Sequence, residues 1–327
     1  VGWLVEEPHR GLTYMFHMMN EARIGVGLGA TMLGHAGYLH SLDYARERPQ
    51  GRLPDEKDPE EPPVAIIEHA DVRRMLLAQK SYVEGALMLC LMCARLVDDI
   101  TVARDEGDEE TADQTEMLLE LLTPIAKAWP SEFCLEANKL AIQVMGGYGY
   151  TSEYPVERYY RDNRLNAIHE GTNGIQAIDL LGRKVTMEHG AALRLLVGRI
   201  QETVADAREH GQLGGYADAL EDAVERATAT TMSLTAVAQD GEVNAFLANA
   251  SVYLEMLGHI VIAWMWLIQG VEAQAQLDRG SDREQMLRGK LQACRYFFRW
   301  ELPKIERQCD LLAEVEDTPL STDPDWF

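Results

Sequence analysis

The sequence is poor in basic side chains. Its 327 residues include 30 Lys and Arg against 53 Asp and Glu, which gives a formal net charge of −23. Binding to nucleic acid or to an anionic membrane surface depends on a positive protein surface. The composition therefore argues against both kinds of partner, and an anionic ligand would need a local basic cluster.

Long hydrophobic runs are also absent. The longest apolar stretch, Ile260–Ile268, is far shorter than the roughly 20 residues that cross a bilayer, so we expect a buried core helix and no membrane insertion. The first residues, VGWLVEEPHRG, show neither an initiator Met nor the layout of a signal peptide. This start indicates a fragment or a processed piece that begins inside a structural element.

Cysteine is scarce and odd in number. Five scattered cysteines favour reduced thiols and a cytoplasmic location over a disulfide framework: Cys90, Cys93, Cys134, Cys294 and Cys309. The Cys90-x-x-Cys93 pair lies at helical spacing in an apolar run, without a second Cys or His pair to complete a zinc site. We therefore predict that these thiols pack in the core, and we predict no metal site.

Strand-like alternation is almost missing, and the apolar residues instead recur at helical spacing. The pattern predicts helices over residues 14–48, 64–102, 114–145 and 175–185. Glycines at 25, 27, 29, 34 and 37 suggest close helix packing, although each costs about 1 kcal/mol of helix propensity. Four helices with short connections predict an all-α fold built on an antiparallel four-helix bundle.

The connections set the expected domain limits. A proline-rich acidic connection runs from Pro49 to Pro63, and Arg104–Asp113 reads as an exposed charged turn. Pro124 and Pro130 are expected to cause local kinks or turns. Beyond residue 188 the sequence pattern changes, and three more helical windows predict an additional helical domain. The windows cover residues 190–210, 216–276 and 282–312; the added domain is 188–315, and a polar tail is 316–327.

One carboxylate stands in a suggestive position. Glu170 follows Ala167 and Ile168 and precedes a Gly171–Thr172 turn at the start of a helix, with Thr172 or Asn173 as N-cap. Spacing alone favours an acid that stabilises the helix start. The alternative is a general base whose pKa is raised by apolar neighbours. His169 beside it is more often a packing residue, although a direct role stays open.

A glycine turn precedes this segment. Gly146, Gly147 and Gly149 let the backbone approach a ligand, and Gln143 stands one helical turn earlier, which suggests a cofactor-lining loop or a plain turn. The third glycine and the preceding strand of a dinucleotide fingerprint are missing, so we exclude a Rossmann site.

Four stretches of the chain carry a resemblance to a known family. They read, in order, GWLVEEPHRGLTYMFHMMNEARIGVGLGA, YARERPQGR, QVMGGYGYTSEYPVERYYRD and IHEGTNGIQ. Together they resemble the C-terminal half of the flavin-dependent acyl-CoA dehydrogenases. The resemblance implies that residues 1–13 end a middle β-domain, that 14–187 form the family's C-terminal helical bundle, and that the N-terminal half is missing. The added domain resembles the extension of longer bacterial-type members, among them long-chain acyl-CoA and 3-methylmercaptopropionyl-CoA dehydrogenases.

The resemblance also implies roles for single residues. Glu170 is implied to take the α-proton of an acyl-CoA thioester while the β-hydride passes to FAD, as in fatty acid β-oxidation. The implied FAD contacts are Arg48, Gln50, Gln143, Gly146, Gly147 and Thr172, and the implied substrate-side residues are Arg23, His169 and Gly171. Arg48 and Gln50 would touch the FAD of a neighbouring subunit, which implies a dimer or tetramer. The implied electron acceptor is an electron-transfer flavoprotein.

Some positions depart from the family pattern. Gly174 stands where many members have a flavin-contacting Gln, and His169 stands where they usually have Tyr. Two other functions remain open. An acyl-CoA oxidase would use the same glutamate and reoxidise its flavin with O₂, whereas a non-catalytic helical subunit or assembly fragment would keep the fold alone.

Overall fold

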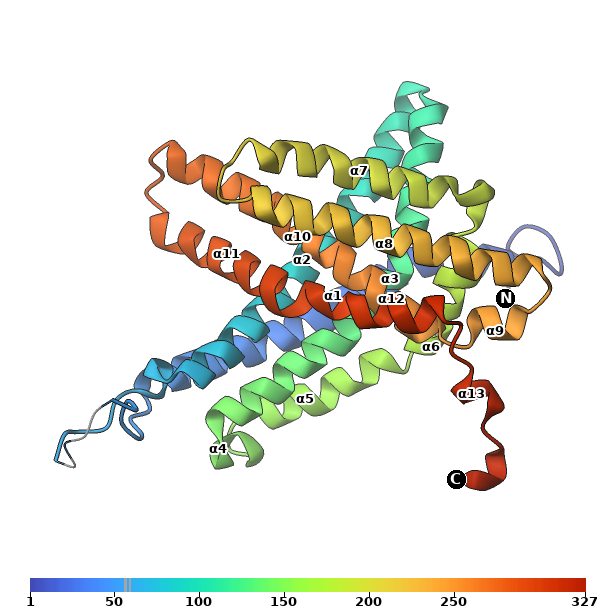
Figure 1. Cartoon of the computed structure of the whole chain (residues 1–327). Coiled ribbons are helices and arrows are strands. Elements are labelled where there is room, and N and C mark those ends of the chain that lie inside the picture. The colour runs from blue at the N-terminus through green and yellow to red at the C-terminus, as the bar shows by residue number, and fades with distance from the viewer. Residues whose placement is uncertain (56–57, 59) are drawn as a thin grey trace.

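Three long helices and a shorter fourth form a bundle. The computed structural model describes residues 1–55, 58 and 60–327. Helices α1 (Gly11–Glu47), α2 (Ala70–Glu106) and α3 (Glu109–Met145) pack along one another, and α5 (Val156–Asn163) packs against α1 and α3 (Figure 1). The described residues contain no strand, only an isolated bridge between Pro49 and Ala65. The predicted all-α bundle is confirmed, but its fourth helix is α5 rather than the predicted helix over residues 175–185.

The helix limits differ from the predicted ones. The first helix starts at Gly11 rather than at residue 14, and α2 starts only at Ala70, after the 3₁₀ turn η1 (Ile66–Glu68). The predicted charged turn over residues 104–113 is wrong, because two residues suffice to separate α2 from α3. Gly107 ends α2 at φ +78°, and Asp108 Oδ1 accepts a hydrogen bond from Thr111 N at 3.1 Å.

Both prolines of α3 lie inside a continuous helix. Pro124 and Pro130 are buried, and α3 continues through both of them to Met145. The predicted turns at these positions are therefore wrong. Buried packing on several sides of this stretch compensates for the backbone hydrogen bonds that proline cannot make.

The connection after α1 folds back on itself. Residues 56, 57 and 59 of the predicted proline-rich connection lie outside the described residues. At its two ends, Gln50 N donates to Val64 O at 2.9 Å and Ile66 N donates to Arg48 O at 2.8 Å. This short ladder fixes the backbone that carries Arg48 and Gln50.

A series of short elements and a second group of helices follow α3. The predicted window 216–276 is two long helices rather than one, because the chain turns at Gly241 with φ +91°. The remaining elements, in order, are α4 (Gly147–Tyr150), η2 (Arg164–Ala167), α6 (Asn173–Asp179), η3 (Leu180–Lys184), η4 (Met187–Gly190), α7 (Ala191–Arg208), α8 (Gly214–Gln239), α9 (Val243–Leu247), α10 (Ala250–Asp278), α11 (Glu284–Tyr296), η5 (Phe297–Glu301), η6 (Leu302–Lys304), α12 (Ile305–Ala313), α13 (Thr318–Ser321) and η7 (Pro324–Trp326).

Helix α10 is the centre of the molecule. It packs against α2, α3 and α6 and also against α7, α8, α11 and α12 of the second group of helices. Every residue of Ile260–Leu267 is buried, so the predicted core helix is confirmed. Among the described residues, α10 is the one helix long and apolar enough to cross a membrane, and 78% of its most apolar window is buried inside the protein.

All five cysteines are free and buried. Burial raises the pKa of the Cys90 thiol to about 12 and also raises that of Cys93. The predicted core-packing role of this pair is therefore confirmed.

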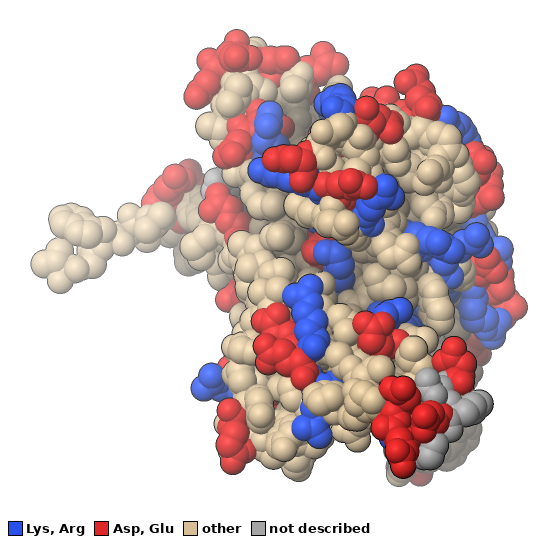
Figure 2. All heavy atoms as spheres, turned by 90° about the vertical axis from the view of Figure 1, so that its left-hand side faces the viewer, with Lys and Arg blue, Asp and Glu red and all other residues tan. Residues whose placement is uncertain are grey.

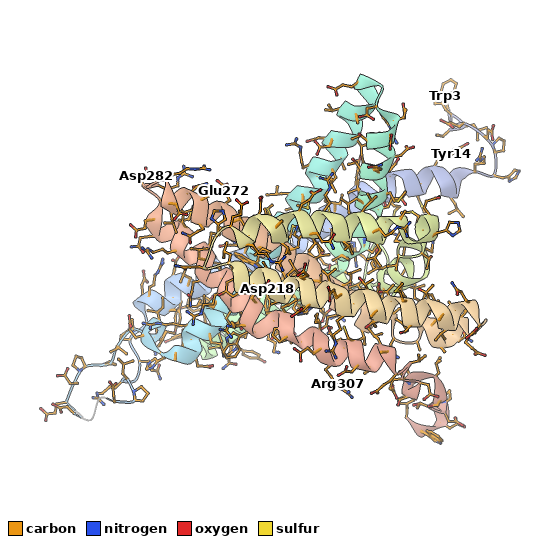
Figure 3. The ribbon with its side chains drawn as sticks, turned by 45° about the horizontal axis from the view of Figure 1, so that its top comes forward. Trp3, Tyr14, Asp218, Glu272, Asp282 and Arg307 are labelled. Carbon is orange, nitrogen blue, oxygen red and sulfur yellow. The ribbon has the colours of Figure 1, made fainter. Side chains whose placement is uncertain are left out.

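Charged groups and two terminal segments occupy the surface. Acidic and basic side chains alternate over the face shown in Figure 2. Trp3 lies on an N-terminal arm that points away from the body, and Glu7 N donates to Tyr14 Oη at 3.3 Å where the arm joins α1 (Figure 3). The predicted polar tail leaves the body with α13 and η7 (Figure 1).

Candidate active site

Glu170 lies in a strained turn between η2 and α6. Its φ is +54° and that of Gly171 is +84°, so two consecutive residues have left-handed backbone. This conformation is uncommon for a residue with a Cβ, and it persists only where the surroundings fix it. The buried Gln176 supplies that restraint, because its Nε2 donates to Glu170 O at 3.1 Å and to Gly171 O at 3.4 Å. The turn holds the Glu170 side chain at the exposed surface.

The residues after Glu170 begin α6. Thr172 is its N-cap, since the Thr172 side chain accepts a hydrogen bond from Ile175 N at 3.3 Å, which confirms the predicted cap. Gly171 is required by space as well as by its φ, because an added Cβ would lie 2.7 Å from Gln176 Nε2. The sequence analysis missed Gln176 as the anchor of this turn.

The neighbours of Glu170 are less apolar than predicted. Ala167 is buried, but Ile168 and Ile175 are 51% and 54% exposed. The described residues of this chain therefore leave the apolar enclosure of the carboxylate incomplete. His169 is directed to η2 rather than to Glu170, because its Nε2 lies 3.1 Å from Asn166 Oδ1.

A buried lysine lies beneath the turn. Lys127, in the middle of α3, is fully buried, and its Nζ donates to Asn173 Oδ1 at 3.2 Å. Burial and, to a smaller extent, the positive charge of Arg23 lower the pKa of Lys127 to about 8, while the negative charge of Glu170 acts in the opposite direction. The sequence analysis missed Lys127; the available signal was a lysine inside the apolar run IAKAW.

Arg23 is fixed by a buried ion pair. Its Nη1 lies 2.9 Å from Asp179 Oδ2, and both side chains are about nine-tenths buried. This pair joins α1 to the end of α6. Because the charge of Arg23 acts on Lys127, Arg23 belongs to the surroundings of the Glu170 turn. Its predicted role on the substrate side stays a prediction.

The other predicted cofactor residues meet at one end of the bundle. The Arg48 guanidinium lies over the Tyr148 ring at 5.7 Å, and its Nη2 donates to Gln50 Oε1 at 3.3 Å. The structure therefore brings the Arg48–Gln50 segment beside the Gly146–Tyr150 turn, near α4 in Figure 1.

This second set is open to a ligand. Gln143, Gly146 and Gly147 are exposed, and a Cβ added at either glycine would meet nothing within 4 Å among the described residues. Arg48 Nε is buried without a hydrogen-bond partner there. A guanidinium group with an unpaired Nε, an exposed amide and open glycine backbone fit a large anionic cofactor such as FAD.

The residues around Glu170 and the residues around Arg48 lie far apart in one chain. Lys127, beneath Glu170, and Gln143 are sixteen positions apart on α3, which corresponds to roughly 24 Å along a helix. Figure 1 shows the same separation, with α4 at one end of the bundle and α6 near the middle of α3. Thr172 therefore does not share a binding surface with Arg48 of the same chain.

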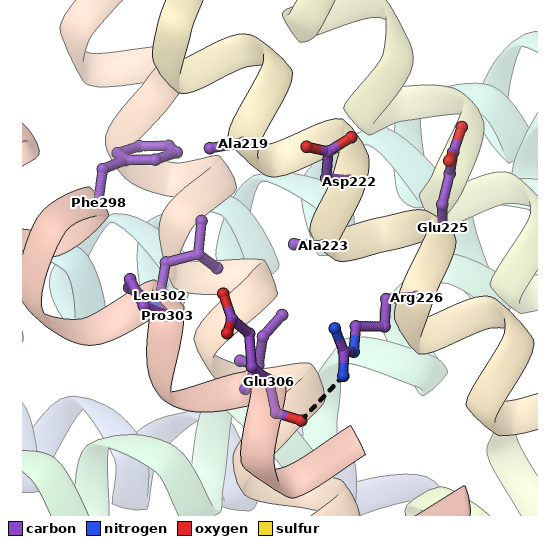
Figure 4. Close-up of a pocket in the computed structure, with 10 residues that line it drawn as sticks. Ala219, Asp222, Ala223, Glu225, Arg226, Phe298, Leu302, Pro303 and Glu306 are labelled. Carbon is purple, nitrogen blue, oxygen red and sulfur yellow. Dashed lines mark hydrogen bonds between the residues drawn. The ribbon is translucent and has the colours of Figure 1, made fainter. Parts of the chain in front are cut away.

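A separate hollow of about 620 Å³ lies between α8 and the η5–α12 segment. Figure 4 shows Asp222 and Glu225 on one side and Phe298 and Glu306 on the other, with Arg226 donating to the Glu306 carbonyl at 3.5 Å. Its lining residues all come from the second group of helices, so it is distinct from the Glu170 turn.

The family assignment follows from comparison with known proteins. Residues 9–185 match the family described as "Acyl-CoA dehydrogenase, C-terminal domain", and residues 196–323 match "Acetyl-CoA dehydrogenase C-terminal like". The chain belongs to the acyl-CoA dehydrogenase family. The predicted resemblance is thereby confirmed.

Named relatives agree with this assignment. The chain is 33% identical to the broad-specificity linear acyl-CoA dehydrogenase FadE5 of Mycobacterium tuberculosis, over 100% of this chain and 54% of that protein. It is 32% identical to the 3-methylmercaptopropionyl-CoA dehydrogenase of Ruegeria pomeroyi, over 98% of this chain and 53% of that protein. The chain thus spans about half the length of these relatives.

A solved structure supports the fold. The acyl-CoA dehydrogenase from Bacillus anthracis, whose structure is complexed with FAD, superposes with a TM-score of 0.69 at 16% identity. The match covers 93% of this chain and 50% of that one. At this identity the likeness concerns the fold of the family's helical region.

Proposed function

We propose that the chain is the C-terminal part of an FAD-dependent acyl-CoA dehydrogenase in which Glu170 removes the substrate α-proton. One observation carries the proposal. The Glu170 carboxylate is exposed, makes no hydrogen bond or ion pair within the described residues, and is held outward by a left-handed turn. A carboxylate kept free in a rigid turn fits a general base better than it fits a stabiliser of the helix start, a role already filled by Thr172.

The same turn can stabilise the charge that proton removal creates. Taking a proton from the carbon next to a thioester carbonyl places negative charge on the carbonyl oxygen, which requires hydrogen-bond donors. The backbone N–H of Glu170 makes no hydrogen bond within the described part of the chain. We assign to it a hydrogen bond to the thioester oxygen, next to the carboxylate that takes the proton.

FAD, when bound, supplies the acceptor for the β-hydride. Arg48, Gln50, Gln143, Gly146 and Gly147 of one chain would hold it, with Thr172 contributed by another chain. The positive Arg48 offers charge complementarity to a diphosphate in an otherwise acidic protein. Because the two sets lie roughly 24 Å apart along α3, a complete site requires at least two copies, so we propose a homo-oligomer.

The remaining assignments follow from the family. We propose an acyl-CoA substrate in fatty acid β-oxidation, an electron-transfer flavoprotein as the electron acceptor, and a cytoplasmic location. The substrate-side roles of Arg23, His169 and Gly171 belong to the same proposal.

A holoenzyme that contains this chain and FAD tests the base assignment. Saturated acyl-CoAs of several chain lengths are mixed with it anaerobically, and bleaching of the flavin absorbance is followed. We expect Glu170→Gln to slow bleaching by about 10²- to 10⁴-fold, the usual contribution of a general base. Glu136→Gln, which alters a surface carboxylate paired with Lys139, serves as the matched control.

Two results would contradict the proposal. If no acyl-CoA bleaches the flavin, the dehydrogenation is wrong, and if Glu170→Gln bleaches as fast as wild type, the base is wrong. Reoxidation by O₂ as efficient as that by an electron-transfer flavoprotein would instead indicate an acyl-CoA oxidase.

A further inference from the structure

Lys127 carries a charge that its hydrogen bond does not balance. The ammonium group is fully buried, and its hydrogen-bond partner is the neutral Asn173 amide at 3.2 Å. Within the described residues, no carboxylate oxygen lies within 4 Å of it. An ammonium ion buried in this way is costly unless an opposite charge nearby compensates it.

The surrounding elements offer few opposite charges. From α1 comes Arg23, which is positive, and from α6 comes Asp179, which is already held by Arg23 at 2.9 Å and by Arg183 at 3.6 Å. Glu132 of α3 accepts a hydrogen bond from Asn173 Nδ2 at 3.3 Å. The carboxylate whose charge acts on Lys127 is that of Glu170.

We propose that Lys127 is a positioning residue for the Glu170 base: its buried ammonium group is the counter-charge of the Glu170 carboxylate and, through Asn173, it fixes the turn that presents that carboxylate. The inference rests on the proposed function. Lys127 lies below the turn and acts on the substrate only through Glu170 and Asn173.

The two contributions have separate physical causes. The negative charge of Glu170 favours the protonated form of Lys127, so the two charges are coupled across the turn. Asn173 is the first residue of α6, so the Lys127–Asn173 hydrogen bond holds the end of the turn that starts at Glu170. In the reaction the proton moves from the substrate α-carbon to Glu170, and Lys127 keeps its own proton.

The coupling can be measured in this chain without cofactor or substrate. Side-chain ¹³Cε signals of its seven lysines are followed against pH, and the signal lost in Lys127→Met identifies Lys127. We expect a midpoint near pH 8 in the wild type. Glu170→Gln should lower this midpoint by about half a pH unit or more, because the charge that supports the protonated form is removed.

A matched carboxylate provides the control. Glu120→Gln neutralises a residue of the same helix that is paired with Lys184, and it should leave the Lys127 midpoint in place. An ordinary lysine midpoint for Lys127, or one that Glu170→Gln does not move, would overturn the inference.

The holoenzyme gives the functional test. The rate of flavin bleaching by acyl-CoA is measured against pH for wild type, Lys127→Met and Lys127→Arg. Losing the positive neighbour should move the acidic limb of the profile to higher pH in Lys127→Met, and Lys127→Arg should restore it towards wild type. A merely structural role would lower the rate evenly across pH and leave the limb in place.

The two failures are distinguishable. If Glu170→Gln bleaches the flavin like wild type, the proposed function fails, whatever the lysine titration shows. If Glu170→Gln is inactive but Lys127→Met leaves the acidic limb unmoved, the inference about Lys127 alone fails. Thermal unfolding of each variant accompanies both measurements, and Lys127→Arg keeps the test valid if Lys127→Met does not fold.

Discussion

At the scale of single residues, the buried charge of Lys127 lowers the free energy of unfolding of the chain. Burial lowers its pKa in the folded chain to about 8 from an ordinary 10.5. Between these two values the unfolded chain binds more protons than the folded chain, so the free energy of unfolding rises with pH in that window. Below about pH 8 the full cost of the buried ammonium ion is present.

We therefore expect Lys127→Met to stabilise the chain at pH 7 by a few kcal/mol at most, since each unit by which burial lowers the pKa corresponds to about 1.4 kcal/mol. The advantage should shrink as pH rises from about 8 to 10.5, because the wild-type lysine then becomes neutral. Urea unfolding of both proteins over this range measures the difference. A difference that does not change with pH would show that Lys127 titrates alike in both states.

Single residues also show how far the sequence could be interpreted. Glu170, Thr172 and the Gly146–Gly147 turn belong to short motifs, so their positions were predictable without the fold. Lys127 was not, because its burial arises from α6 packing against α3, and its partner Asn173 is 46 positions away. Local patterns identify the residues of a site, whereas the charges beneath them depend on tertiary contacts.

At the scale of elements, glycines set the distance between α1 and α3. A Cβ added at Gly27 would lie 1.9 Å from Ala126 O, and one added at Gly34 would lie 2.8 Å from Cys134 Cβ. At Gly25 and Gly29 an added Cβ meets nothing within 4 Å in the described part of the chain. The predicted close packing is thus confirmed for one face of α1. The seven-residue spacing of Gly27 and Gly34 was the signal that could have identified this face.

Gly27→Ala should destabilise the chain by more than about 2 kcal/mol, because neither backbone can yield without shifting a helix. Gly25→Ala is the matched control and should be neutral or stabilising by up to about 1 kcal/mol, since alanine favours helix. Urea unfolding followed by circular dichroism compares the two variants. Equal stability of Gly27→Ala and Gly25→Ala would contradict the close approach of the two backbones.

At the scale of the whole molecule, the bundle and the second group of helices share one hydrophobic core. Trp266 of α10 is fully buried, and its Nε1 donates to Ser81 O of α2 at 2.9 Å, across 185 positions of sequence. The domain boundary near residue 188 stays a prediction. A core that extends across it could not be inferred from the sequence, because periodicity shows that a face is apolar without showing what covers it.

We expect Trp266→Ala to lower the free energy of unfolding by about 3–5 kcal/mol, the usual cost of emptying a buried tryptophan site. Because the core is shared, circular dichroism and the fluorescence of the remaining tryptophans should report one coincident transition. Trp300→Ala, at a residue 56% exposed, is the control and should cost less than about 1 kcal/mol. Two separate transitions, with the α1–α3 bundle unaffected, would contradict a shared core.

The length of α3 has a genetic consequence under the proposed shared site. In an oligomer built only of chains altered at Arg48, every site is defective, and the same holds for an oligomer built only of chains altered at Glu170. In a dimer that contains one chain of each kind, both altered residues fall in the same site. The second site receives an intact Arg48 from one chain and an intact Glu170 from the other. Two defective alleles, expressed together, thus complement each other, because roughly 24 Å of helix keeps their lesions in different sites.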